Sequence, residues 1–305
     1  MTLKDAWPLL KQTGQEFQND KAMTLGAALA FYTALSIAPL LLLVIVIAGA
    51  VYGAEAARGG IAHQLDDLIG SEGARAVEGM LAKTQTPGGG AVSTIVGVVT
   101  LLIGATGVFG SLQEALNTVW NVKPDAASAG LWGLVRDRLL SFSMVCGMAF
   151  LLLVSLVFSA ILAGLGGAFE RWLPYSSVWL GVANQVVGFL VTTLMFAMIY
   201  KVLPHARPAW SDVWVGALMT AALFTVGKCL IGLYLGKAAV GSSFGAAGSF
   251  VVLLFWIYYS SLILLFGAEF TQVYAQTFGT GLVPAARPKA GPRTEPGIGP
   301  APVPA

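Results

Sequence analysis

Long stretches of uncharged, mostly apolar residues dominate this chain, and short polar segments separate them. Five stretches contain no Asp, Glu, Lys or Arg, and a sixth is interrupted only by Lys228: residues 22–54, 84–113, 139–169, 172–200 and 238–268, and then 213–236. About 20 apolar residues are enough to cross the hydrocarbon core of a bilayer as a helix. The pattern therefore predicts six transmembrane helices, at about residues 24–53, 91–119, 139–164, 178–200, 213–235 and 245–274.

Two polar segments beside these stretches also carry apolar residues at helical spacing. In residues 1–21 an apolar stripe runs through Trp7, Leu10 and Phe17, and we expect an interfacial helix on the cytoplasmic side of the first span. In residues 55–83 apolar positions recur in the same way, so we expect an amphipathic outer loop that lies on the membrane surface or folds over the bundle. The simpler interpretation of this loop is a packing lid without a ligand role.

The chain therefore divides into residues 1–21, a six-span membrane domain over residues 22–278, and a cytoplasmic tail over residues 279–305. The tail holds seven of the 14 prolines together with several glycines. Because this composition does not build a packed core, we expect the tail to be disordered. Residues 1–21 are polar and mixed in charge, so we expect no cleavable signal peptide.

Composition agrees with a lipid environment for most of the chain. Hydrophobic residues make up 56% of the sequence and charged residues only 10%, with a mean hydropathy of +0.77, whereas soluble proteins carry about 25% charged residues. The expected fold class is an all-α integral membrane protein, a six-transmembrane-helix bundle. The net charge of +2 is too small to indicate a nucleic-acid partner.

The distribution of positive charge predicts the orientation of the chain. Most of the 17 Lys and Arg residues lie in the two tails and in the loops on the same side of the membrane as the tails. Because Lys and Arg concentrate in cytoplasmic segments, we expect both the N-terminus and the C-terminus to lie in the cytoplasm.

Three ionisable residues fall inside the expected spans. Glu114 and Glu269 lie near the cytoplasmic ends of the second and sixth spans, whereas Lys228 lies beyond the midpoint of the fifth span, toward the outer face. An ion pair between Lys228 and Glu269 would have to bridge about 15–20 Å along the helix axis, so we reject it. Lys228 either extends toward the outer surface or faces the bundle interior, where it would attract an anion.

Two interpretations of the glutamates stay open. As interfacial anchors they would form ion pairs with the basic residues at cytoplasmic helix ends, which are Arg136, Arg138 and Lys201. As a functional site they would form a polar vestibule with Gln113 and Asn117 that binds a cation, carries protons or selects a substrate.

The sequence lacks the usual motifs for metal or nucleotide chemistry. Its only two histidines, His63 and His205, fall on opposite sides of the expected membrane and cannot share a metal ion. No HExxH motif or CxxC pair is present for zinc, and no GxxxxGK[ST] loop is present for ATP. We therefore expect no metal, no cofactor and no enzymatic activity.

Four separated motifs resemble, in order, those of the YihY/BrkB family of bacterial inner-membrane proteins. They are LGAALAFYTALSIAPLLLLVI, GVFGSLQEALNTVWNVKP, YKVLPHARPAWSDVWVGAL and FGAAGSFVVLLFWIYYSSLILLFGAEFTQVYA, and the resemblance covers about residues 15–278. It implies location in the bacterial inner membrane and, since members are generally treated as transporters or exporters, movement of a small molecule. The family was once labelled ribonuclease BN, an activity for which this sequence lacks metal-binding residues.

Two functions from different classes follow. The first is a secondary transporter or exporter of a small polar or anionic solute. The second is a membrane scaffold that acts in envelope integrity or binds lipid without transporting anything. Both need the lipid bilayer as a partner, the first also needs a small-molecule solute, and both are compatible with a homo-oligomer.

Overall fold

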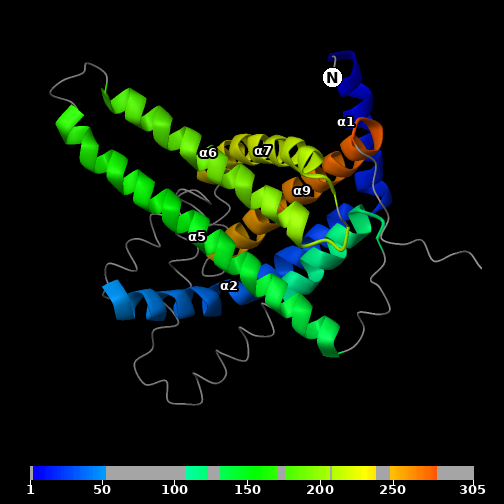
Figure 1. Ribbon diagram of the computed structural model, residues 1–305, viewed down its shortest axis with the longest axis horizontal. Helices are drawn as coiled ribbons and strands as arrows, with labels where there is room; N and C mark the ends of the chain where they lie inside the picture. The colour runs from blue at the N-terminus through cyan, green and yellow to red at the C-terminus, as the bar shows by residue number, and fades with distance from the viewer. Residues whose placement is uncertain are drawn as a thin grey trace, which may run out of the picture.

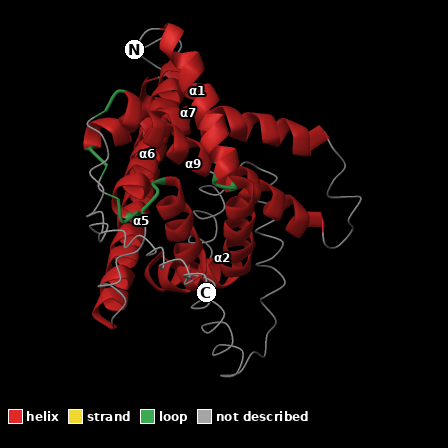
Figure 2. Ribbon diagram, turned by 90° about the vertical axis from the view of Figure 1, so that its right-hand side faces the viewer, coloured by secondary structure: helices red, strands yellow, loops and turns green. Residues whose placement is uncertain are grey.

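The computed structural model describes residues 3–52, 107–122, 131–169, 176–206, 208–237 and 248–279. Helices make up nearly all of this described part, with short loops between them and no strand (Figures 1 and 2). The helices are α1 (Leu3–Asn19), α2 (Ala22–Tyr52), α5 (Leu131–Phe169), α6 (Ser176–Val202), α7 (Trp210–Lys237) and α9 (Gly248–Thr277), together with a helical segment at residues 107–119. The outer loop expected at residues 55–83 and the tail beyond residue 279 lie outside the described residues.

Three of the described helices are long and apolar enough to cross a membrane, over Trp179–Val202, Trp210–Ile231 and Val251–Thr277. Shorter apolar helical stretches occur at Ala22–Ile37 and Cys146–Leu162. The expectation of an all-α membrane protein is therefore confirmed. Six spans remain a prediction, because much of the chain expected to form the second span lies outside the described part.

Large apolar side chains cover the outside of the long helices. Phe150 and Val157 of α5 and Trp179 and Leu190 of α6 are each more than half exposed. Such a surface would make a soluble protein aggregate, whereas the acyl chains of a bilayer solvate it. The exposed face of these helices is therefore the face expected to contact lipid.

α9 is the helix against which most of the other described helices pack. α2 and α7 pack along it, α6 packs against α7, and α5 packs against α6 (Figure 1). α7 and α9 approach closely where small residues face each other: a Cβ atom on Gly216 would overlap Thr271, and one on Gly267 would overlap Thr220. Small residues allow transmembrane helices to gain close packing contacts where lipid removes the hydrophobic driving force.

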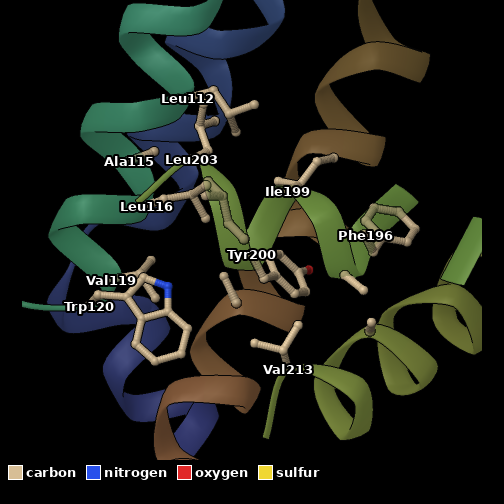
Figure 3. Close-up of a cluster of buried hydrophobic side chains, with 14 of the residues drawn as sticks. Leu112, Ala115, Leu116, Val119, Trp120, Phe196, Ile199, Tyr200, Leu203 and Val213 are labelled. Atoms are coloured by element: carbon tan, nitrogen blue, oxygen red, sulfur yellow. The ribbon is translucent and has the colours of Figure 1, made fainter. Parts of the chain in front are cut away.

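A buried cluster joins the helical segment 107–119 to α6, α7 and α9 (Figure 3). Trp120 and Tyr200 are its largest members, and each is at most 1% exposed. The Tyr200 hydroxyl group forms a hydrogen bond of 3.0 Å with Thr220 Oγ1 and donates one of 2.8 Å to the backbone oxygen of Leu264. These bonds tie α6 to α7 and α9 inside the cluster.

α1 packs along the carboxy-terminal half of α9 (Figure 1). Phe17 meets Phe266 edge-on, with ring centroids 5.9 Å apart, and Leu9 is buried in a cluster with Phe270. A turn at Lys21, whose φ is 53°, then leads into α2. The end of α1 and this turn are thereby held beside the buried face of α9.

Candidate functional site

A cavity of about 330 Å³ lies between α5, α6 and α7. Seven of the side chains that line it are polar: Ser155, Ser159, Asn184, Gln185, Thr192, Thr225 and Lys228. None of the lining residues, all of which are described, is acidic. Polar and charged side chains are rare inside membrane helices, and their concentration marks this cavity as a candidate binding site.

The hydrogen bonds around the cavity indicate which side chains would bind a ligand. Ser159 Oγ donates a hydrogen bond of 2.6 Å to Asn184 Oδ1, which ties α5 to α6. The hydroxyl groups of Thr192 and Thr225 donate to backbone oxygens of their own helices. The N–H donors of the cavity therefore come from the amide groups of Asn184 and Gln185 and from the ammonium group of Lys228. This set of groups suits an anion with oxygen acceptors.

Lys228 and Glu269 lie at different depths in the bundle. α7 and α9 run antiparallel, and Gly227 of α7 lies against Tyr259 of α9. Lys228 is therefore level with Tyr259, which precedes Glu269 by almost three turns, and about 15 Å separates the two charged residues along the helix axis. This register excludes an ion pair between them, as expected from their places in the sequence.

Glu269 is completely buried on α9, and its carboxyl group meets another carboxyl group. This group is the Asp20 carboxyl in the turn after α1, which lies within hydrogen-bonding reach, and Glu16 of α1 acts on Glu269 electrostatically. Neither Glu269 oxygen receives a hydrogen bond from an N–H or O–H donor of the described residues. Burial raises the pKa of Asp20 above its ordinary value of 3.8, the hydrogen bond to Glu269 opposes this rise, and the charge of Glu16 adds to it.

Within the part of the chain that is described, none of the basic residues expected as partners of the glutamates forms an ion pair with Glu269. Lys201 Nζ donates a hydrogen bond of 2.6 Å to the backbone oxygen of Pro208 and lies 5.3 Å from the centre of the Trp210 ring. Arg136 and Arg138 lie on α5, and their side chains are outside the described part.

The structure does not bring Glu114 together with Glu269. Glu114 is exposed on the helical segment 107–119, because Ala115 and Leu116 turn the other face of this segment into the core. The sequence places both glutamates at a similar depth, but depth does not determine which way a side chain points around the helix. The two glutamates therefore do not line one vestibule.

Gln113 and Asn117 bind the loop between α6 and α7. Gln113 Nε2 donates a hydrogen bond of 3.2 Å to the backbone oxygen of Leu203. Asn117 Nδ2 lies 3.0 Å from His205 Nδ1, and the backbone N–H of His205 donates to Asn117 Oδ1 at 2.9 Å. These contacts give the two amide side chains a structural role, since they hold the loop against the helical segment 107–119.

The hydropathy pattern did not reveal three residues of the two polar sites, which are Asp20, Ser155 and Ser159. A signal for Asp20 was its place two residues before the first apolar stretch, at the same expected depth as Glu269. Ser155 and Ser159 are four residues apart, so they lie on one face of their helix. That spacing was the available signal for a polar face on the third apolar stretch.

Comparison with known families matches residues 13–292 to the family described as virulence factor BrkB. Among curated proteins, this chain is similar to UPF0761 membrane proteins from several bacteria. That of Ralstonia nicotianae is 30% identical over 57% of this chain and 38% of its own length. That of Alkalilimnicola ehrlichii is 24% identical over 86% of this chain and 57% of its own length, and that of Alteromonas mediterranea is 25% identical over 82% of each chain.

The chain thus spans about half of the length of the first two of these relatives, or less. No solved structure matches the chain.

Proposed function

Because the chain belongs to the virulence factor BrkB family and is a membrane protein, we propose that it is a secondary transporter of a small anionic solute. The proposal includes a location in the bacterial inner membrane, with both termini in the cytoplasm. It assigns no catalytic residue, metal or cofactor to the chain. The lipid bilayer and the solute are its partners, and the function is compatible with a homo-oligomer.

The observation that carries the proposal is the polar cavity between α5, α6 and α7, in a bundle whose outer surface is apolar. A charged residue near the bilayer centre costs about 2.5–3.5 kcal/mol on insertion scales. Charged side chains are therefore rare inside membrane helices. Lys228 lines the cavity beside Asn184 and Gln185. The ammonium group of Lys228 would attract an anion in the cavity, because opposite charges attract strongly where water is scarce.

The chemistry of the lining supports discrimination between solutes by charge. An anion would form charge-assisted hydrogen bonds with Lys228, and the amides of Asn184 and Gln185 would bind its remaining oxygens. A cation would meet Lys228 without any acidic side chain among the lining residues to bind it. The cavity lies between three helices, so a shift of α5 against α6 and α7 would change its access to either side.

Metabolite profiling with a matched pair of variants tests this proposal. Cell extracts and spent medium are compared between a deletion strain and strains that produce the wild type, Lys228→Leu or Lys228→Arg at equal membrane abundance. We expect one anionic metabolite to change its distribution between cells and medium on deletion. The wild type should restore the distribution, Lys228→Arg should restore part of it, and Lys228→Leu should restore none.

The scaffold function is the alternative outcome of the same experiment. If no metabolite changes while the deletion strain becomes sensitive to envelope stress, and if Lys228→Leu corrects that sensitivity as well as the wild type does, the transport proposal is wrong. Lys228 then serves only the stability or the membrane position of α7.

A further inference from the structure

We propose that Asp20 and Glu269 form a proton-binding site, in which one proton is shared between the two carboxyl groups across the interface of α1 and α9. This site is distinct from the cavity at Lys228. It does not depend on the transport function, because it follows from the packing of α1 on α9 alone. Its ligand is the proton itself.

The burial of Glu269 is the first argument for a bound proton. The side chain is 0% exposed, and both of its carboxyl oxygens lack an N–H or O–H donor among the described residues. An ionised carboxylate without donors is very unfavourable away from water, and such a group takes up a proton instead. The neutral acid needs only one acceptor for its O–H group, and Asp20 provides it.

The contact between the two carboxyl groups is the second argument. The carboxyl groups of Asp20 and Glu269 lie within hydrogen-bonding reach of each other. Ionised carboxylates are acceptors only, so a hydrogen bond between the two groups requires that one of them carries a proton. A nearby pair of carboxyl groups that shares one proton avoids the repulsion of two negative charges. Partial burial of Asp20, which raises its pKa, acts in the same direction.

The surrounding charges favour the protonated pair. On the α1 side the nearby group is Glu16, whose negative charge disfavours a second ionised carboxylate. The helices packed against α9 place their ionisable groups elsewhere: Asp212 lies near Gly279, Lys228 is level with Tyr259, Lys201 binds Pro208, and Glu114 is exposed. Lys21 is exposed in the turn after Asp20. The described part of α2 that flanks this turn, Ala22–Ile37, contains no charged residue.

A proton fits this site better than a metal ion does. Within the described residues, no group of three or more His, Cys, Asp or Glu side chains is arranged to hold a metal. Hard cations such as Mg²⁺ and Ca²⁺ require six or more oxygen ligands. Asp20 and Glu269 together supply at most four carboxyl oxygens, which is fewer than these cations require.

Infrared difference spectroscopy on the full chain in lipid nanodiscs tests the site directly. The pH of a sodium-free buffer is raised in steps, and the carbonyl band of a protonated carboxylic acid is followed together with the carboxylate bands, in H₂O and in D₂O. We expect a carbonyl band in the wild type at neutral pH, and its replacement by carboxylate bands at higher pH. Glu269→Gln, a neutral variant of the same shape, should lose this band.

Two further variants separate the pair from other carboxyl groups. Asp20→Asn should change the frequency of the carbonyl band, because the hydrogen-bond acceptor of Glu269 becomes an amide. Glu114→Gln removes an exposed carboxyl group on another helix and should leave the band unchanged.

The proposal is overturned if the wild type shows no protonated carboxyl group at neutral pH, or if the band persists in Glu269→Gln. It is also overturned if sodium ions abolish the band at constant pH, since the pair would then be a cation site. Because these readouts involve no solute, they do not change if the transport proposal fails.

Discussion

Asn117 contacts His205 through both the nitrogen and the oxygen of its side-chain amide group. The Asn117 amide nitrogen lies 3.0 Å from His205 Nδ1, and its oxygen accepts a hydrogen bond of 2.9 Å from the backbone N–H of His205. The two residues belong to segments 88 positions apart in the chain. Together with the bond from Gln113 to the backbone of Leu203, this pair determines where the loop between α6 and α7 lies.

Replacing Asn117 by alanine should lower the stability of the folded protein. The change removes two hydrogen bonds and leaves groups of His205 without partners, at a cost of about 1–3 kcal/mol. Thermal unfolding of the purified protein in detergent measures the effect. Gln276→Ala is the matched control, because this exposed amide at the end of α9 should be replaced with little change. Equal unfolding temperatures for the two variants would contradict the structural role assigned to Asn117.

Gly267→Ala should destabilise the contact between α7, α6 and α9. A Cβ atom at this position would overlap Thr220 Oγ1 and lie 2.6 Å from the Tyr200 hydroxyl oxygen, and overpacking of this kind costs about 1–3 kcal/mol. Thermal unfolding again measures the change, and a second change of Thr220→Ala should recover part of the loss. Gly181→Ala is the control, since nothing lies within 4 Å of its added Cβ atom. If both glycine variants unfold alike, the close approach at Gly267 is not needed.

A cysteine in the cavity should react faster with an anionic reagent than with a cationic one. In a chain whose Cys146 and Cys229 are replaced by alanine, Ser155→Cys places a thiol group in the lining of the cavity that Lys228 also lines. The ammonium charge should raise the rate of an anionic thiosulfonate over that of its cationic analogue by about tenfold at low salt. Adding Lys228→Leu should remove this preference. A preference that survives in the leucine variant would show that Lys228 does not control the charge of the cavity.

The stability that Asp20 contributes should fall as pH rises. Its pKa is raised in the folded protein, so the folded state binds a proton more tightly than the unfolded state does. The contribution is therefore greatest below the ordinary value of 3.8, and it is lost as pH rises through the raised pKa.

Unfolding temperatures of the wild type and of Asp20→Asn over a pH series measure this effect. The difference between them should shift in favour of the variant from about pH 4 upward, because the variant cannot ionise at this position. A difference that stays constant with pH would contradict the raised pKa of Asp20.

The apolar stretches were sufficient to predict that the chain is a helical membrane protein, because a run of about 20 apolar residues needs lipid around it. They also placed Lys228 and Glu269 at different depths, since the rise per residue of a helix is constant. Depth along the helix is thus readable from sequence position alone.

The pattern does not predict which way each helix is rotated. A membrane helix is apolar on its lipid face and on its packed face alike, so periodicity does not separate Glu114, which is exposed, from Glu269, which is buried. The partner of Glu269 depends further on the docking of α1, which is determined by contacts such as Phe17 with Phe266. Those contacts join the two ends of the described chain and have no local signature.

The central position of α9 has a consequence for the order of assembly. α9 is the last helix of the described chain, yet α1, α2 and α7 all pack on it. At a synthesis rate of about 5–20 residues per second, α2 waits on the order of 10–40 s for its neighbour. Until α9 is made, the turn at Asp20 and, for a shorter time, the face of α7 around Gly216 have no partner helix. Packing of the described helices is therefore complete only after α9 has joined α1, α2 and α7.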